Sequence, residues 1–394
     1  MSAVQNLIYR WWKYTLSRLS VKKDASIWLF GEWFGERCGD NCAYLANHIA
    51  ANHPEIKLFW VAKRDCDTSI LLPSIRVLEM GAEETKKVAE NAGVVIVNQS
   101  FSDISEEGIN TFARALTVNL WHGVMWKKIG HDGDKRKDSL LFRTYCSLLD
   151  PVQRAKRYLS PSEIYCEKMQ SAFNIPANCF IRCGCPRNSL FYDPESISRC
   201  RSKILKLAAL PENAVIVTYM PTFRDKGSRT VDLREIVNDA FEKYMCENNV
   251  FIIQKAHFVD ENRADVSDTA GSSHIIDLNS VMAAELLAAS DLLITDYSSC
   301  FFDYLILDRP IVHFLYDYDF YRNNDRGLYF DQEDVVCGDV AVTAEDLRNA
   351  VKENLCEPEK KKQRRNQIRE RFLSYESRDS CEKLYQSIKV ELKA

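Results

Sequence analysis

Residues 292–310, LLITDYSSCFFDYLILDRP, followed by IVHFLY at 311–316, contain the pattern that decides the fold. A short apolar strand ends at Thr295, a polar turn follows, and an apolar helix leads into a second short apolar strand. Strands joined through a helix run parallel, because the helix returns the chain to the end of the sheet at which it started. The stretch therefore predicts a parallel sheet covered by helices.

The same alternation extends in both directions. In the second half we expect strands at 214–224 and 249–258 and helices at 233–248 and 281–291. The first half repeats the series, with the following expected elements: strands at 26–33, 56–63, 94–100 and 115–123, and helices at 42–54 and 83–93, the latter ending at Gly93. Two such series predict two doubly wound, Rossmann-like α/β domains that face a cleft.

Four segments follow from this pattern. We expect an amphipathic N-terminal helix at 1–22, a first domain at 23–190, a second domain at 191–375, and a helix at 376–394 that could cross back to the first domain.

Composition limits the class of protein. The chain has 394 residues, 46% of them apolar and 27% charged, which excludes a disordered chain, and its net charge of −4 gives no global field for nucleic acid. No run of about 18 apolar residues and no secretory leader pattern is visible, so we expect a cytoplasmic protein whose 14 cysteines are reduced. The cysteine spacings do not form a zinc pattern, and we predict no metal cluster.

Two segments could meet a membrane surface. The first is the N-terminal segment. Its mostly apolar residues at helical spacing are Val4, Leu7, Ile8, Trp11, Thr15 and Leu19, with Trp12 beside Trp11 and the basic residues Arg10, Lys13 and Arg18 between them. Such a helix lies in a headgroup layer, or packs its tryptophans on the protein itself. The second is a basic stretch from Lys127 to Arg157 with interleaved apolar residues, which fits anionic lipid or a solvated helical face.

The turn after Thr295 is the first candidate site. Ser298 and Ser299 open the next helix, where unpaired N–H groups and a partial positive charge suit a phosphate, and Asp296 lies in the turn itself. A serine at this position can also be an ordinary N-cap. The place of the turn, after a strand of the second series, favours ligand binding.

Three other polar groups follow strands or loops of the second half. Lys255 and His257 are alternate residues and share one strand face, whereas Thr222 and Arg224 follow a strand directly. Arg326 lies on a later loop. Each could bind phosphate; the alternatives are a strand that turns polar as it leaves the sheet, or a salt bridge between domains.

His122 is the candidate general base. It follows a strand of the first half and precedes Gly123, which allows close approach of a substrate, and Lys127 and Lys128 come within a turn. A histidine that only binds loop carbonyls is the alternative.

Taken in order, these motifs resemble one protein family. They are WHG at 121–123 with the lysine pair, PTFRD at 221–225, QKAH at 254–257, SDLLITDYSSCFFDYLILDRP at 290–310 and DRGLYFD at 325–331, together with GDN at 39–41 and GCPRN at 184–188. Over residues 30–380 the chain resembles the CDP-glycerol glycerophosphotransferases, a family of teichoic acid primases and polymerases.

The resemblance implies a GT-B-like fold, in which the first domain faces acceptor and membrane and the second domain binds the CDP-polyol donor. It also implies roles for individual residues. His122 and His257 would be the catalytic histidines, Ser298 and Ser299 would hold the donor phosphates, and the loops containing Asp40, Asn41, Lys127 and Lys128 would lie on the acceptor side. Val124 and Met125 depart from the family, which usually has threonine and proline there, and so does Phe258, where the family usually has proline.

The implied activity is transfer of a glycerol-phosphate unit from CDP-glycerol to a hydroxyl of a polyprenyl-linked saccharide or polyol-phosphate acceptor, with release of CMP. The resemblance also implies a peripheral enzyme at the cytoplasmic face of an anionic membrane, which builds a teichoic-acid-like or capsular polymer. We expect no required cofactor; a Mg²⁺ ion bound between Asp296 and phosphate is the alternative. The alternatives are a CDP-ribitol-dependent transferase, a nucleotide-sugar glycosyltransferase on the same fold, and a non-catalytic membrane scaffold.

Overall fold

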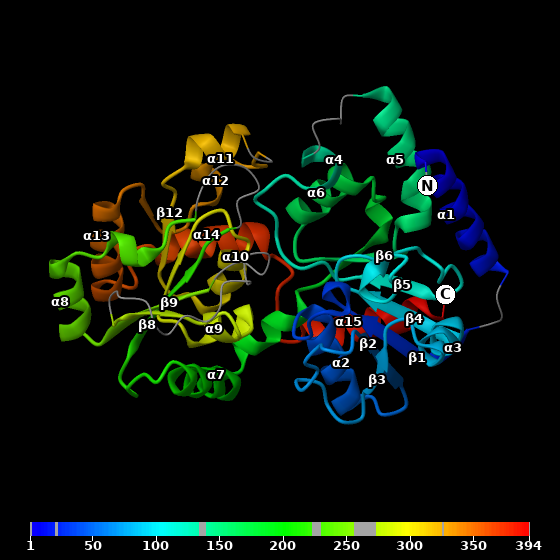
Figure 1. The fold of residues 1–394 in the computed structure, drawn as a ribbon, viewed down its shortest axis with the longest axis horizontal. Coiled ribbons are helices and arrows are strands. Elements are labelled where there is room, and N and C mark those ends of the chain that lie inside the picture. The colour runs from blue at the N-terminus through cyan, green and yellow to red at the C-terminus, as the bar shows by residue number, and fades with distance from the viewer. Residues whose placement is uncertain are drawn as a thin grey trace. The chain divides into compact units, whose positions relative to one another are not determined.

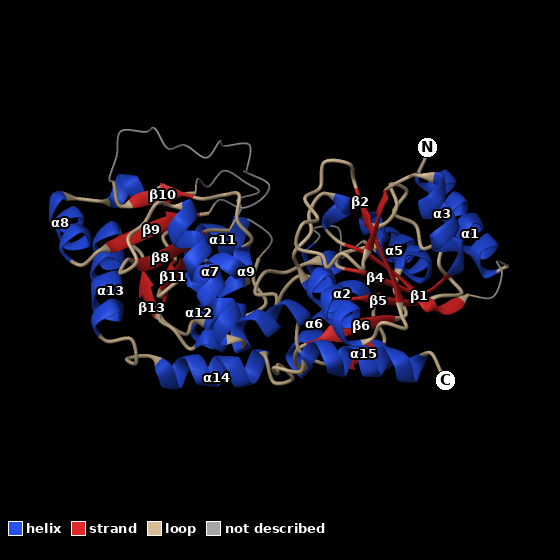
Figure 2. Cartoon of the chain, turned by 90° about the horizontal axis from the view of Figure 1, so that it is seen from below, coloured by secondary structure: helices blue, strands red, loops and turns tan. Residues whose placement is uncertain are grey.

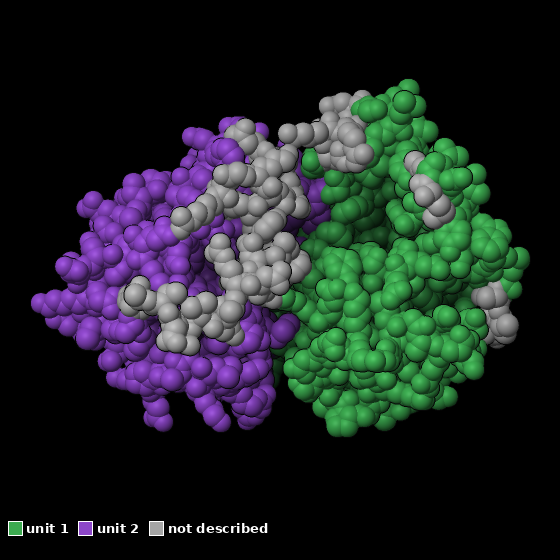
Figure 3. Space-filling view, viewed as in Figure 1, with its two compact units in different colours: residues 1–122, 130–189, 374–394 green, residues 123–129, 190–373 purple. Residues whose placement is uncertain are grey.

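The computed structural model describes residues 2–19, 23–133, 139–222, 230–255, 273–324 and 327–393. Contacts between Cα atoms divide the chain into two compact units, coloured separately in Figure 3. The first unit contains residues 1–122, 130–189 and 374–394, and the second contains residues 123–129 and 190–373. The chain therefore leaves the first unit directly after His122, contributes one short segment to the second, and returns at Gly130.

Parallel strands form the sheet of the first unit in the order β3-β2-β1-β4-β5-β6-β7, counted over the described residues. The strands are β1 (Asp24–Gly31), β2 (Lys57–Ala62), β3 (Arg76–Glu79), β4 (Ala92–Val97), β5 (Leu116–Asn119), β6 (Arg157–Ser160) and β7 (Phe180–Arg182). The helices are α1 (Ala3–Arg18), α2 (Asn41–Asn52), α3 (Glu83–Asn91), α4 (Gly130–Gly133), α5 (Leu140–Gln153), α6 (Glu163–Phe173) and α15 (Ser380–Glu391) (Figure 1).

The second unit repeats this plan with the order β10-β9-β8-β11-β12-β13, again parallel throughout the described strands. Its strands are β8 (Val215–Met220), β9 (Val250–Gln254), β10 (Ile275–Asp277), β11 (Leu292–Thr295), β12 (Ile311–Phe314) and β13 (Asp339–Ala341). Its helices are α7 (Pro194–Leu207), α8 (Asp239–Glu247), α9 (Ala283–Ala289), α10 (Cys300–Tyr304), α11 (Tyr318–Asn324), α12 (Gln332–Val335), α13 (Ala344–Cys356) and α14 (Lys362–Phe372).

Both sheets are doubly wound, with helices on their faces (Figure 2). Strand order reverses between β1 and β4 in the first unit and between β8 and β11 in the second. Ligands of such sheets bind outside the carboxyl ends of the strands at this switch point. The predicted fold class, two parallel sheets covered by helices, is confirmed. The switch point of each sheet is the place where we expect that unit to bind a ligand.

The core of the first unit contains apolar residues from segments that lie far apart in the sequence. Residues of α2 such as Leu45 and Ile49 pack on β1 and β2, and Leu384 and Ile388 of α15 join the same buried cluster. The helix nearest the C-terminus thus belongs to the first unit, although its preceding neighbour α14 belongs to the second.

Two local predictions are wrong. The helix expected at 233–248 is a 3-10 turn at Leu233–Ile236 followed by α8, because the side chain of Asn238 accepts a hydrogen bond from the Phe241 amide at 2.9 Å and starts a new helix. Gly93 does not end the helix at 83–93; α3 ends at Asn91 and Gly93 lies inside β4, where a Cβ atom would collide with the Asp24 carbonyl.

The N-terminal helix α1 packs one of its tryptophans on the protein and leaves the other largely exposed. Trp11 donates its indole N–H to the Leu148 carbonyl of α5 at 2.9 Å, so one tryptophan packs on the protein. Trp12 is 55% exposed, and Ile8 beside it on α1 is 64% exposed. Among the described residues, no helix has the length and apolarity needed to cross a bilayer.

Candidate active site

His122 lies at the carboxyl edge of the first sheet, in the loop that follows β5. Its neighbour Trp121 has a φ of 54°, a left-handed conformation that is rare for a bulky side chain. Such strain costs on the order of 1–3 kcal/mol and persists only where surrounding bonds enforce it. Here the Trp121 amide donates to Asn119 Oδ1 at 2.8 Å, and Asn119 in turn donates to the Gln99 carbonyl at 2.8 Å.

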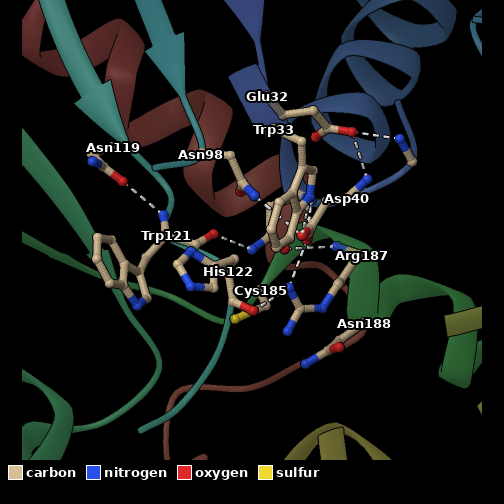
Figure 4. Close-up of polar contacts among 12 residues, drawn as sticks. Glu32, Trp33, Asp40, Asn98, Asn119, Trp121, His122, Cys185, Arg187 and Asn188 are labelled. Carbon is tan, nitrogen blue, oxygen red and sulfur yellow. Dashed lines mark hydrogen bonds and ion pairs between the residues drawn. The ribbon is translucent and has the colours of Figure 1, made fainter. Parts of the chain in front are cut away.

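A second strained loop supplies another aromatic neighbour. Trp33 and Phe34, which follow β1, have φ values of 48° and 58°. The Trp33 ring lies 5.3 Å from the His122 ring, centroid to centroid, and the Trp121 ring stacks on His122 at 4.6 Å (Figure 4). The imidazole is therefore oriented by two indoles from the loops after β1 and β5.

A buried ion pair holds the backbone of this loop. Arg187 Nη1 lies 2.6 Å from Asp40 Oδ1, and both side chains are only 9% exposed. The same nitrogen donates to the His122 carbonyl at 3.0 Å, and Asn41 Nδ2 donates to the Trp121 carbonyl at 2.8 Å (Figure 4). The motifs at 39–41 and 184–188 thus meet at His122 and fix its main chain.

Glu32 supports the start of α2 beneath this pair. Its Oε1 accepts hydrogen bonds from the amides of Gly39 and, at 2.8 Å, Asp40. Complete burial, with the nearby Asp40 carboxylate as the second cause, raises the pKa of Glu32 to about 8. Glu32 is therefore protonated at neutral pH.

Asp103 connects the loops after β1 and β4. Its Oδ2 accepts from the amides of Asn98 and Gln99 at 2.9 and 2.7 Å, and its Oδ1 accepts from the amide of Phe34 at 2.9 Å. Burial raises its pKa, and these backbone donors oppose that shift. Asp103 acts as a brace at the switch point, because it fixes both loops that border it.

The second unit gathers most of its predicted residues at one edge as well. Asp296 follows β11, is fully buried, and accepts from the Thr222 amide at 2.8 Å and the Tyr297 amide at 2.6 Å through Oδ1. Thr222 follows β8, and Lys255 follows β9 with its ammonium 2.6 Å from the Asn279 carbonyl. Asp296 thus braces the turn at the switch point of the second sheet.

The serine pair lies at the partly exposed end of this turn. Helix α10 begins at Cys300, two residues later than expected, and Ser299 occupies the N-cap position without a side-chain capping bond. Ser298 Oγ accepts from the Cys300 amide only at 3.5 Å, at the limit of a hydrogen bond. Ser299 makes no capping bond and Ser298 only accepts one long bond, so both hydroxyls can still donate to a ligand.

Residues 123–129 dock on the second unit next to this turn. Lys127 and Leu328 form an antiparallel bridge, and Trp126 donates its indole N–H to the Phe330 carbonyl at 2.8 Å. The Trp126 ring packs on Tyr297 and against the edge of His313. Burial lowers the pKa of His313 to about 4, so this histidine is neutral and structural.

The docking brings two sequence motifs together within the second unit. The Lys128 amide donates to the Gly327 carbonyl at 3.0 Å, and the Lys128 side chain lies over Gly327. Gly123, Val124 and Met125 are buried in the same segment. Three predicted residues, Arg224, His257 and Arg326, lie outside the described residues.

Sequence reasoning missed much of the support around His122. Glu32, Trp33, Asn98 and Asp103 carry no motif of their own, and Trp121 and Arg187 entered only as part of motifs in the family resemblance. The available signal was positional: several of these residues directly follow apolar strands whose carboxyl ends share one sheet edge.

A large cavity lies elsewhere in the first unit. It measures about 680 Å³ and opens at the amino ends of the strands, opposite His122, near residues that begin β1, β4 and β6. Its lining is basic: Lys23, Arg114, Arg154, Lys156 and Arg157 face only one carboxylate, Glu391. Its position excludes it as the site of His122 chemistry.

Comparison with known proteins gives the family. Residues 13–390 match the family described as CDP-Glycerol:Poly(glycerophosphate) glycerophosphotransferase. A teichoic acid poly(glycerol phosphate) polymerase of Bacillus spizizenii (strain ATCC 23059 / NRRL B-14472 / W23) is 30% identical over 59% of this chain and 60% of that protein. A teichoic acid glycerol-phosphate transferase of Staphylococcus aureus (strain NCTC 8325 / PS 47) is 24% identical over 86% of each chain.

A solved structure shows the same fold. The wall teichoic acid polymerase TagF superposes with a TM-score of 0.78 at 22% identity, over 99% of this chain and 96% of that chain, and its fold is GT-B-like. The chain spans between 42% and 60% of the length of three poly(glycerol phosphate) polymerases that it matches. The match over residues 13–390 shows that this chain belongs to the CDP-glycerol:poly(glycerophosphate) glycerophosphotransferase family.

Proposed function

We propose that this chain transfers a glycerol-phosphate unit from CDP-glycerol to an acceptor hydroxyl and releases CMP, in the synthesis of a teichoic acid or a related capsular polymer. The family to which it belongs supports the reaction type. The observation that carries the proposal is the conformation of the loop around His122, which lies at the ligand-binding edge of a doubly wound sheet. The loop is strained at Trp121, and the Arg187–Asp40 ion pair and the buried carboxyl groups of Glu32 and Asp103 hold it and its neighbouring loops in place.

The donor would bind the second unit. Ser298 and Ser299 offer hydroxyls that can donate to a phosphate, and Lys255 follows a strand at the same edge of the sheet. Arg224, His257 and Arg326 are proposed to add positive charge around the diphosphate. Asp296 would act as the brace of the turn, because its Oδ1 already accepts two backbone amides.

The acceptor would meet His122. The imidazole takes the proton of the acceptor hydroxyl, whose oxygen attacks the β-phosphorus of CDP-glycerol. A bond forms between that oxygen and the β-phosphorus, the bond from the β-phosphorus to the bridging oxygen breaks, and CMP leaves with the bond's electron pair. A positioned base contributes about 10²–10⁴-fold to such a step, and positioning with charge stabilisation contributes most of the rest.

The first test replaces the base. His122→Ala should lower CMP release by at least about 10²-fold while CDP-glycerol still binds, because the donor groups lie in the second unit. His131→Ala is the matched control, since His131 belongs to the same unit and its Nε2 lies 3.6 Å from Asp150 Oδ1. Wild-type turnover of His122→Ala would remove the imidazole from the mechanism.

Donor identity needs a separate assay. Incubation with CDP-glycerol, CDP-ribitol and UDP-sugars, followed by product mass, separates the proposed activity from a ribitol transferase and from a glycosyltransferase. A chain that binds none of these donors would be a scaffold. The same assay with a chelator tests the Mg²⁺ question, and no step here depends on a metal.

We further propose that the enzyme works at the cytoplasmic face of the membrane on a polyprenyl-linked saccharide or polyol-phosphate acceptor. Exposed apolar residues gather on α1 and α5, which pack against each other: Val4, Ile8, Trp12, Leu16, Leu140 and Leu141. The basic cavity belongs to the same unit and lies beside Tyr14 of α1. Apolar side chains near concentrated positive charge suit an anionic lipid surface.

A further inference from the structure

Two histidines and a glutamate from two helices of the first unit converge on one point. His48 lies in α2, His53 caps its C-terminal end, and Glu382 lies in the first turn of α15. Nε2 of His48 is 2.8 Å and Nε2 of His53 is 2.9 Å from the same oxygen, Oε2 of Glu382. One ligand atom from each residue lies within 4.8 Å of the others.

We propose that His48, His53 and Glu382 bind a divalent transition-metal ion, with Zn²⁺ the best fit, and that the ion clamps α15 to α2. Bond lengths of about 2.0–2.2 Å place neighbouring ligand atoms of a tetrahedral zinc site roughly 3.3 Å apart. The two imidazole nitrogens therefore need to move from the carboxylate oxygen by only about 0.5 Å to admit the ion. Water would complete the coordination, as it does in zinc sites with three protein ligands.

The three ligand atoms indicate which class of metal the site suits. Two imidazole nitrogens with one carboxylate oxygen suit zinc and similar transition metals, whereas Mg²⁺ and Ca²⁺ require mainly oxygen ligands. The side chains of His48, His53 and Glu382 are 27%, 18% and 40% exposed, so an ion and its water can enter from solvent.

Neighbouring side chains orient two of the ligands. Gln386 Nε2 donates to Glu382 Oε1 at 2.7 Å, which leaves Oε2 to face the imidazoles. The His53 ring stacks on Tyr385 at 3.6 Å between centroids, and Tyr385 donates to Glu55 at 3.0 Å. The bonds from Gln386 first, and then from the two histidines, lower the pKa of Glu382 to about 2, so this ligand is ionised at neutral pH. Such outer contacts are typical of metal ligands.

The clamp would act on the segment that supports the ion pair at His122. Glu376 precedes α15 and accepts from the Cys185 amide and from Asn188 Nδ2, both at 3.0 Å. These residues flank Arg187 on either side. Fixing the start of α15 would therefore stabilise the loop from which Arg187 reaches Asp40.

The test uses the whole chain, stripped with a chelator and then titrated with Zn²⁺. Wild type should bind one equivalent more than His53→Phe, which keeps a ring to stack on Tyr385, and one more than Glu382→Gln, which keeps its bond to Gln386. Because only the native state holds the site, the Tm shift caused by Zn²⁺ should be more positive in wild type than in either variant by about 3 °C or more. Mg²⁺ at the same concentration should do nothing.

The variants keep all 14 cysteines, so zinc bound to thiols is common to every sample and cancels in the difference. Equal stoichiometry and equal Tm shifts in wild type and variants would overturn the proposal. Should a variant fail to fold, Co²⁺ added to wild type decides the matter: a visible absorption band of a nitrogen- and oxygen-ligated site that zinc abolishes supports it, and the absence of that band refutes it.

Discussion

One guanidinium nitrogen of Arg187 lies 2.6 Å from the carboxylate of Asp40 and 3.0 Å from the main-chain carbonyl of His122. Asp40 also accepts from Trp33 Nε1 at 2.9 Å and Asn98 Nδ2 at 3.1 Å. The ion pair thus connects the loop after β7, the start of α2 and the backbone of the proposed base. Its loss should affect stability and turnover together.

Arg187→Met should destabilise the chain by about 3 kcal/mol, because it leaves the Asp40 carboxylate buried without its cation. Arg182→Met is the control, since Arg182 and its partner Glu163 are 47% and 57% exposed and such pairs are worth about 1 kcal/mol or less. Urea unfolding of both variants measures the difference. Equal losses in the two variants would show that the Arg187 pair is no more important than a surface pair.

Arg187→Lys should separate stability from function. A lysine keeps the charge near Asp40, but its shorter side chain does not place a nitrogen at the position of Arg187 Nη1, so the His122 carbonyl loses its hydrogen-bond donor. We expect kcat to fall by at least about tenfold with the KM for CDP-glycerol unchanged, because the residues proposed to bind CDP-glycerol lie in the second unit. A higher KM for CDP-glycerol with normal kcat would instead place Arg187 in the CDP-glycerol-binding site.

Glu32 should make stability depend on pH. Its pKa is raised to about 8 in the folded chain and returns to its ordinary value of about 4.3 on unfolding. Between these values the folded state holds a proton that the unfolded state has lost, so stability is greatest at low pH and falls as pH rises, by at most about 1.4 kcal/mol per unit from this group.

Glu32→Gln tests this slope, because the amide oxygen can still accept from Gly39 and Asp40 but does not titrate. Urea unfolding between pH 5 and 8 should give a flatter profile for the variant than for wild type. Glu36→Gln is the control, since Glu36 is 60% exposed in its pair with Lys63 and should leave the slope unchanged. Parallel profiles for wild type and Glu32→Gln would exclude a protonated Glu32.

The double variant Ser298→Ala, Ser299→Ala should weaken CDP-glycerol binding by about 10–100-fold, as expected for two hydroxyls that donate to a charged phosphate. Its Tm should stay near that of wild type, because Ser299 makes no capping bond and Ser298 only one of 3.5 Å. Ser202→Ala, on the exposed surface of α7, is the control. Calorimetric titration with CDP-glycerol measures the effect, and unchanged affinity would move the donor site away from this turn.

Membrane binding should depend on the exposed face of α1. Ile8→Glu with Trp12→Glu should abolish flotation with anionic vesicles without lowering Tm, because both residues are more than half exposed. Val342→Glu, at a site 54% exposed in the second unit, should float like wild type. Unchanged flotation of the α1 variant would assign the contact to the basic stretch ending at Arg157.

Local sequence decided a large part of the fold. Strand β11 ends at Thr295 as predicted, because a short apolar run gives way to a polar turn there. Prediction failed where one side chain altered the backbone, as Asn238 does by starting α8 inside an expected longer helix. A single capping residue outweighs the helical spacing of its neighbours.

The sequence by itself determined the two parallel sheets, the helices between their strands, and the serine pair after β11, because apolar period and turn residues act over a few positions. Only the tertiary structure decided that Arg187 reaches Asp40, 147 residues away, that Glu32 loses its charge, and that residues 123–129 dock beside Tyr297. These features depend on which strand ends share an edge and on how deeply a carboxyl group is buried, and both arise from packing between distant segments.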